Sequence, residues 1–395
     1  MSSEVINLLE EKEKCSACGA CMAVCPKMAI KMVEDECGYF YPSIDNDLCI
    51  GCGKCIRTCT YRTKPEANET IEAYAAISTK KQVLDNCASG GIFGNIATNF
   101  IKTGYVAGAI FDSDGKNREV YHYVTNNPDD IPSLQGSKYV QSSAWKSYSE
   151  ISELLKKGKT VLFTGTPCQV DAIKRITGNP DNLFTIDLIC HGVPPMKMLN
   201  EFLDGFSKVI AAPIDRIIFR DNKIEVPFHA RIKTIKRGHN KDYILHSELL
   251  SYYKYFLNGK FYRTNCYSCQ YACGKRCGDL TIGDYWGIEK HHSDLIHKDE
   301  SWSCVLVNTS KGKSLLENYG VGIKLTESKF DWVKEQNEQL VKPSKKPDDR
   351  ESLLNTYKMG GYKAIEKKFR KFRKGQVRYY WQVWKEIISN RKYSK

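Results

Sequence analysis

The sequence predicts an α+β fold in three parts, namely a small cysteine-rich N-terminal domain, a larger layered α/β domain and a basic helical C-terminal tail. Three observations predict this division. A set of four cysteines is repeated within the first 60 residues, apolar strands alternate with helical stretches from about residue 73, and basic and aromatic side chains crowd residues 363–395. We place the three parts at residues 1–68, 69–342 and 343–395.

The N-terminal domain contains an internal repeat of four cysteines. The first copy has the spacing C-x2-C-x2-C-x3-C-P, and the second lies 34 residues further along the chain. Such spacing is typical of bacterial-type ferredoxin domains, in which three cysteines of one copy bind a 4Fe–4S cluster and the fourth binds its neighbour. We therefore expect two 4Fe–4S clusters. One is expected on Cys15, Cys18, Cys21 and Cys59, and the other on Cys25, Cys49, Cys52 and Cys55.

Zinc is the alternative metal for these cysteines, since it also binds C-x2-C pairs. Two copies of the C-x2-C-x2-C run favour iron–sulfur cubes, because soft thiolates and nearby small residues suit them. The second copy has Thr60 where the first has Pro26, which loosens one turn and removes no ligand. Cys37 lies outside the pattern and is expected to be a plain thiol.

The second part alternates strands and helices, which predicts an α/β domain built in layers. The expected strands are 73–78, 105–111, 160–163 and 183–190, and the expected helices are 90–102, 147–157, one after Pro167 and one from Met196. A strand-rich stretch around one aromatic helix follows at 216–288. Residues 305–308 have the pattern of another buried strand.

The segment Ser89-Gly90-Gly91 lies between an expected strand and an expected helix and is a candidate anion site. Free backbone N–H groups at a helix start attract phosphate. An ordinary serine N-cap with permissive glycines explains the same residues equally well. The segment alone therefore does not decide between the two interpretations.

Two further strand ends carry cysteines, in the segments Thr166-Pro167-Cys168-Gln169 and Cys190-His191. Ligands of α/β folds gather at the carboxyl ends of strands, so these cysteines are expected to lie close together. A C-x2-C pair at Cys266 and Cys269 and a glycine- and aspartate-rich segment at 278–287 complete the set.

Together these motifs resemble the family formed by the beta subunits of coenzyme F420 hydrogenases and dehydrogenases, over most of residues 1–310. The resemblance implies an α/β domain that binds FAD, exchange of a hydride or electron pair between the deazaflavin F420 and FAD, and a third 4Fe–4S cluster near the flavin. It also implies the site residues. The FAD phosphates are expected at Ser89, Gly90 and Gly91, the flavin beside Thr166, Pro167 and Gln169, and the third cluster on Cys168, Cys190, Cys266 and Cys269.

A local metal site, zinc included, is the alternative for the third cluster. That site would use Cys266, Cys269, Cys273 and Cys277, which all lie within one short segment. Cys168 and Cys190 could instead be buried thiols that bind no metal. We expect Cys87 and Cys304 to be such structural thiols.

His191 is the candidate catalytic residue, because an imidazole titrates near neutral pH and this one lies near the flavin that the resemblance implies. A hydrogen-bonded structural histidine is the commoner case. Asp279 and Asp284 are expected to be turn or cap residues beside glycine. Lys80 and Arg276 are expected to be solvated rather than bound to phosphate.

The formal net charge of +13 is concentrated in the tail, where residues 363–395 hold twelve Lys and Arg against two Glu. The aromatic residues among these charges suit a docked helix, a membrane surface or a partner contact, and no nucleic-acid-binding motif accompanies them. Seventeen cysteines without an apolar leader favour metal thiolates in the cytoplasm over a disulfide scaffold.

The sequence therefore predicts a cytoplasmic iron–sulfur flavoprotein that passes electrons between a small-molecule hydride donor or acceptor, FAD and the clusters, with a redox partner protein or subunit. Coenzyme F420 is the expected hydride partner. Two alternatives remain. One is a ferredoxin-dependent reductase of a small metabolite such as a polysaccharide precursor, and the other is an electron-relay subunit without a substrate of its own.

Overall fold

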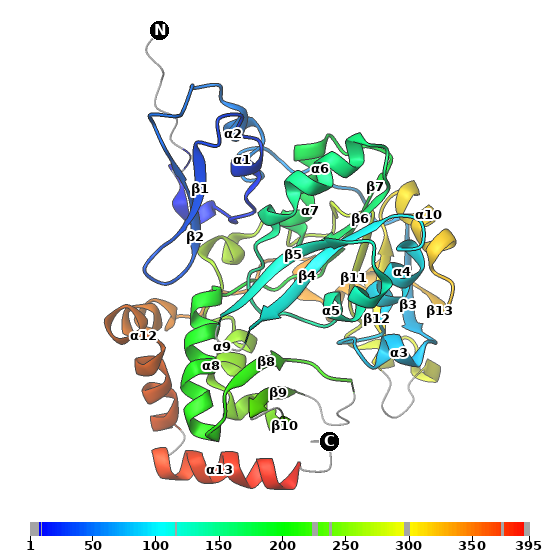
Figure 1. Cartoon of the computed structure of the whole chain (residues 1–395). Coiled ribbons are helices and arrows are strands. Elements are labelled where there is room, and N and C mark those ends of the chain that lie inside the picture. The colour runs from blue at the N-terminus through cyan, green and yellow to red at the C-terminus, as the bar shows by residue number, and fades with distance from the viewer. Residues whose placement is uncertain are drawn as a thin grey trace.

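The computed structural model describes residues 8, 10–114, 117–222, 228–236, 239–295, 301–372 and 375–390. In Figure 1 the N-terminal domain (dark blue) lies beside one side of a large twisted sheet, the brown C-terminal helix lies just below that domain, and the red one lies at the bottom of the view. Lys358 of the brown helix pairs with Glu36 of the N-terminal domain at 3.3 Å. The last five residues of the basic tail, 391–395, lie outside the described residues.

The N-terminal domain repeats one small unit, as its sequence does. Its elements are η1 (Lys12–Lys14), α1 (Ala20–Ala23), β1 (Ile30–Glu34), β2 (Phe40–Ile44) and α2 (Lys54–Arg57). Each copy folds as a cysteine-bearing loop followed by a single helical turn, and β1 and β2 form an antiparallel pair between the copies. Gly19 and Gly53 precede the two turns with φ angles of +78° and +67°, in the left-handed region that favours glycine.

The large sheet has the strand order β13-β3-β12-β11-β7-β6-β4-β5. Its strands are β3 (Glu72–Ser78), β4 (Tyr105–Ser113), β5 (Arg118–Thr125), β6 (Val161–Gly165), β7 (Leu183–Leu188), β11 (Leu280–Asp284), β12 (Ser303–Val307) and β13 (Ile323–Ser328). The neighbours β11, β7, β6 and β4 run parallel, whereas β12, β13 and β5 pair antiparallel with their neighbours. The carboxyl ends of the parallel strands therefore meet at one edge.

Helices cover both faces of this sheet. They are α3 (Lys81–Leu84), α4 (Ile92–Phe100), α5 (Ile131–Leu134), α6 (Tyr148–Lys156), α7 (Pro167–Thr177), α10 (Ser310–Tyr319) and α11 (Phe330–Lys334), with short turns η2 (Pro128–Asp130), η3 (Ala144–Lys146), η6 (Ile288–Lys290), η7 (Ser293–Leu295) and η8 (Glu338–Leu340). Consecutive strand residues point to opposite faces. Accordingly Leu162 packs with α4 and α10, while Val161 and Phe163 pack with α6 and α7.

A second helical layer surrounds a three-stranded antiparallel sheet. Its elements are α8 (Met196–Ile210), β8 (Ile214–Ile218), β9 (His229–Lys236), β10 (His239–His246), η4 (Ser247–Leu249), α9 (Ser251–Leu257), η5 (Thr264–Ser268), α12 (Arg350–Phe372) and α13 (Gln376–Ser389). The tail helices α12 and α13 bury Tyr357, Ile365, Tyr379 and Val383 in one core with α8. The tail is thus packed against the rest of the chain through these buried residues.

The other side of α13 exposes Val377, Trp381 and Trp384. Contact of this face with a membrane surface stays a prediction. No helix among the described residues has the length and apolar character needed to span a bilayer.

The expected alternation of strands and helices is confirmed from β3 to α8, each element lying within a few residues of its predicted range. The sequence pattern does not predict strand β5. Two of its buried positions hold the polar residues Arg118 and His122, so the alternation of apolar and polar residues typical of a strand is not visible there.

Candidate iron–sulfur centres

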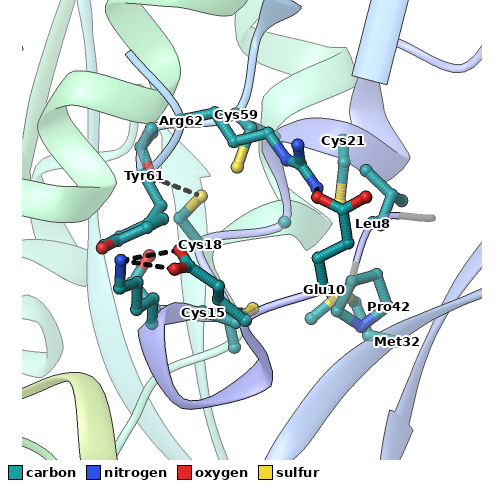
Figure 2. Close-up of a pocket in the computed structure, with 17 residues that line it drawn as sticks. Leu8, Glu10, Cys15, Cys18, Cys21, Met32, Pro42, Cys59, Tyr61 and Arg62 are labelled. Carbon is teal, nitrogen blue, oxygen red and sulfur yellow. Dashed lines mark hydrogen bonds and ion pairs between the residues drawn. The ribbon is translucent and has the colours of Figure 1, made fainter. Parts of the chain in front are cut away.

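The first cysteine site is a cavity of about 400 Å³ in the N-terminal domain. It is lined by Cys15, Cys18, Cys21 and Cys59, the set expected for one cluster. Figure 2 shows these four cysteines around the cavity, three from the first copy of the repeat and Cys59 from the second. The backbone N–H of Ala17 lies 3.4 Å from the Cys15 sulfur, and the Thr60 hydroxyl lies 3.4 Å from the Cys18 sulfur. Such donors suit thiolate ligands.

The second cysteine site lies in the same domain and is lined by Cys25, Cys49, Cys52 and Cys55. Each site thus combines three cysteines of one copy of the repeat with the fourth cysteine of the other copy, as the spacing predicts. Cys52 is exposed, and Ile50, which lines this site, is an exposed apolar side chain. The second site is therefore closer to solvent than the first.

The third cysteine site lies where the carboxyl ends of β6 and β7 meet η5. Its pocket is lined by Cys168, Cys190, Cys266 and Cys269. Cys168 is in the first turn of α7, Cys190 follows β7, and the other two belong to or follow η5. Ser16 from the N-terminal domain lines both this pocket and the first one. The first and third sites are therefore neighbours.

The local alternative for Cys266 and Cys269 receives less support from this geometry. Cys273 and Cys277 do not line the third pocket. The Cys277 thiol is buried and donates to the Pro167 carbonyl at 3.2 Å, and the Cys273 thiol faces the Gln270 and Lys275 carbonyls.

The donor set of each site fits a 4Fe–4S cluster, which takes four thiolates. Burial raises the pKa of Cys18 and that of Cys266 to about 11, and burial also raises the pKa of Cys190. A buried thiol ionises only when a cation compensates the charge. Bound iron would supply that compensation.

The segment from Ser89 to Gly91 lies outside the three cysteine pockets, near the carboxyl end of β3. The Gly90 N–H donates to the Ser303 hydroxyl at 2.9 Å, and a Cβ on Gly90 would lie 2.4 Å from the Ala76 carbonyl oxygen. Gly91 has φ +76° and caps α4. Packing and backbone conformation therefore explain both glycines, and phosphate binding at this segment stays a prediction.

Thr166, Pro167 and Gln169 form the start of α7. The Thr166 N–H and hydroxyl both donate to the Gln169 side-chain oxygen, at 3.0 and 3.1 Å, and the amide nitrogen of Gln169 donates to the Ser142 carbonyl and hydroxyl. Gln169 is buried and its polar atoms are satisfied within the chain. Thr166 and Pro167 line the third pocket, whereas Gln169 does not.

His191 lies at the rim of the third pocket and is exposed. Its backbone carbonyl accepts a hydrogen bond from the Ser344 hydroxyl at 2.6 Å. Its ring makes no hydrogen bond with any residue that the structure describes. The catalytic role of His191 stays a prediction.

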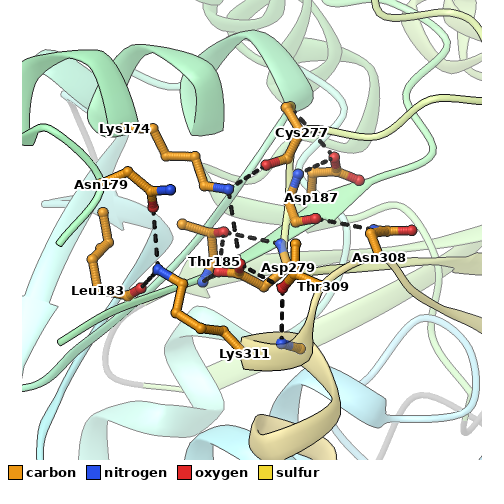
Figure 3. A network of polar contacts seen from close by, with 12 residues as sticks. Lys174, Asn179, Leu183, Thr185, Asp187, Cys277, Asp279, Asn308, Thr309 and Lys311 are labelled. Atoms are coloured by element: carbon orange, nitrogen blue, oxygen red, sulfur yellow. Dashed lines mark hydrogen bonds and ion pairs between the residues drawn. The ribbon is translucent and has the colours of Figure 1, made fainter. Parts of the chain in front are cut away.

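Asp279 was expected to be a turn or cap residue, and this prediction is wrong. It is fully buried and accepts hydrogen bonds from the Thr185 N–H and hydroxyl, at 2.8 and 2.6 Å, and from the Thr309 hydroxyl at 2.8 Å. The Lys174 Nζ lies 3.8 Å from the Asp279 Oδ1. Figure 3 shows how this network joins α7, β7 and the start of α10. Its partners are distant in sequence, so a local glycine pattern could not reveal it.

Arg276 was expected to be solvated, and this prediction is also wrong. It is 2% exposed and pairs with Asp187 at 2.9 Å, while its other N–H groups donate to Thr281, Tyr271 and Leu188. It lines the third pocket. Arg263, which the sequence analysis did not single out, lines the same pocket. Its position three residues before Cys266 was the only available signal.

The cysteine sites and the mixed sheet define a class, that of iron–sulfur proteins in which a ferredoxin-like domain precedes an α/β domain. The family model for a 4Fe-4S dicluster domain matches residues 14–63. The models for the coenzyme F420 hydrogenase/dehydrogenase beta subunit, N-terminal and C-terminal, match residues 73–148 and 158–331. These two ranges take in more than half of the chain. The chain therefore belongs to this family of oxidoreductases, as the resemblance of its motifs implied.

Two relatives illustrate the range of similarity. A subunit of the F(420)H(2) dehydrogenase of Methanosarcina mazei is 22% identical, over 95% of this chain and 94% of its own length. Uncharacterized protein MJ1349 of Methanocaldococcus jannaschii is 28% identical over 45% of this chain, and the match spans only 57% of that protein. A chain of the F420-reducing [NiFe] hydrogenase complex from Methanosarcina barkeri has a TM-score of 0.45 at 16% identity, covering 74% of this chain and 94% of that one.

Proposed function

We propose that this oxidoreductase passes electrons between coenzyme F420, FAD and three 4Fe–4S clusters. One observation carries the proposal, namely that twelve cysteines from distant segments group into three sites of four. The family supports F420 as the hydride partner. Ser16, shared by the first and third pockets, supports an electron route from the N-terminal domain into the α/β domain.

The proposed roles follow the three sites. The first and second cysteine sites hold the clusters of the N-terminal domain, and the third holds the cluster nearest the flavin. FAD, when bound, converts a hydride transfer into single-electron steps. Its proposed surroundings are the carboxyl-end edge of the sheet, from Ser89, Gly90 and Gly91 to Thr166, Pro167 and Gln169, with His191 as the candidate catalytic residue.

The chain is proposed to consist of three parts and to work with a partner subunit. We keep the divisions at residues 1–68, 69–342 and 343–395 and the cytoplasmic location as predictions. A partner subunit is proposed because a relative that matches along nearly its whole length is itself named as one subunit of a dehydrogenase. The exposed surroundings of the second cysteine site, which include Ile50 and Cys52, suit the entry or exit of electrons.

An anaerobic assay tests this function. Purified chain, reconstituted with iron, sulfide and FAD, is mixed with reduced F420, and the visible absorbance of flavin and clusters is recorded. We expect the absorbance to fall without any added protein, because the flavin accepts the hydride and passes single electrons to the clusters. A chain that binds its cofactors and yet reacts only after a partner subunit is added would instead support the relay alternative.

A further inference from the structure

Arg263 is unusual among the buried arginines of the described chain because it lacks a carboxylate partner. Arg118 pairs with Asp204, Arg231 with Asp221 and Asp242, Arg276 with Asp187, and Arg350 with Glu351. Arg263 is 1% exposed and forms no ion pair with a described residue. A buried charge without a counter-charge is strongly destabilising, so an anion is expected nearby.

The contacts of Arg263 are all with neutral groups. One terminal nitrogen donates to the Gln141 side-chain oxygen at 3.2 Å, and the other donates to the Cys15 carbonyl at 3.0 Å. The guanidinium carbon lies 4.8 Å from the centre of the Tyr41 ring and 5.8 Å from that of Tyr39. The Nε–H is buried and has no hydrogen-bond partner. These contacts leave the Nε–H without an acceptor and place no carboxylate opposite the charge.

Arg263 borders two of the cysteine sites. Its hydrogen bond to Cys15 places it against the first cysteine site, and it also lines the third pocket. The Cys266 N–H also donates to the Arg263 carbonyl at 3.0 Å, so Arg263 contacts a cysteine of each site.

We propose that Arg263 is the counter-cation shared by the clusters of the first and third cysteine sites, with its Nε–H donating to a sulfur in the third pocket. The inference rests on the proposed function, because it requires clusters at both sites. A thiolate-bound cluster becomes more negative when it accepts an electron, so a nearby cation and a hydrogen bond to sulfur favour the reduced form. Arg263 therefore raises both reduction potentials, while the second site lies outside its contacts.

The test is an EPR-monitored anaerobic titration of the full chain with dithionite, which supplies one electron to each cluster. Arg263→Gln is expected to shift the potentials of the first and third clusters downward and to leave that of the second unchanged. A Cys52→Ala variant identifies the signal of the second cluster by its loss. Arg57→Gln is the matched control, since the exposed Arg57 donates to the Cys52 carbonyl at 3.1 Å. This control is expected to affect the second cluster alone.

Iron content is measured first, which separates this inference from the proposed function. An unaltered chain that binds no iron contradicts the function. Arg263→Gln with full iron content and three unchanged potentials overturns the inference alone. Arg263→Lys, which keeps the charge, is expected to show a much smaller downward shift than Arg263→Gln. Equal shifts in the Lys and Gln variants, or loss of iron from both, would show that Arg263 acts through packing and would also overturn the inference.

Discussion

Cys190→Ser is expected to remove one 4Fe–4S cluster, about four irons per chain, while the first and second cysteine sites stay filled. The hydroxyl that replaces the soft thiolate is a poor ligand for iron in this setting. Loss of a group that merely orients a ligand costs about 10–100-fold in metal affinity, and loss of a ligand should cost at least as much. Iron analysis and the EPR spectrum of the reduced protein measure the effect.

The same variant is expected to interrupt electron flow. Reduced F420 should still bleach the flavin, but the clusters of the N-terminal domain should no longer be reduced at the wild-type rate. The proposed route reaches them through the third site, which shares Ser16 with the first. Cys273→Ser is the matched control, since this cysteine lies outside the third pocket, and it should keep the full iron content. Loss of metal from Cys273→Ser with retention in Cys190→Ser would instead support the local site.

Asp187→Ala is expected to lower the free energy of unfolding by about 3–5 kcal/mol, because it leaves the buried Arg276 without its counter-charge. Asp187 is 0% exposed and also accepts the Gly278 N–H at 2.9 Å. Urea titration of the apoprotein, followed by tryptophan fluorescence, measures the change as a lower midpoint.

Lys81→Ala is the control for the buried pair. Lys81 pairs with Asp85 at the surface, and its side chain is 87% exposed. Removal of an exposed ion pair should cost no more than about 1 kcal/mol. If Asp187→Ala and Lys81→Ala unfolded at the same urea concentration, the buried pair would not have the structural role that its geometry indicates.

The cysteine sites could be predicted from the sequence to the extent that their chemistry is local. In the first two sites the spacing of each run determines which sulfurs can share a cluster, and the structure brings together the same two sets. The third set required the family resemblance, since Cys168 and Cys190 are separated from Cys266 by whole secondary-structure elements. The structure lines one pocket with these cysteines and Cys269.

The buried charges could not be predicted from the sequence. Arg276 and Asp187 are 89 residues apart, and Arg263 contacts Cys15 across 248 residues. A local pattern treats such arginines as solvated surface groups, which is the usual case. Similarly, the Asp279 network joins elements whose contact depends on the order of strands in the sheet, and the sequence left that order undetermined.

If thiolates of the three cysteine sites bind iron–sulfur clusters beside a flavin, reconstituted protein should contain about twelve irons from three cubic clusters and about one FAD per chain. Anaerobic quantitation of iron, sulfide, zinc and flavin measures these contents. About eight irons with bound zinc would rule out the third cluster, and a colourless, iron-free chain would rule out all three.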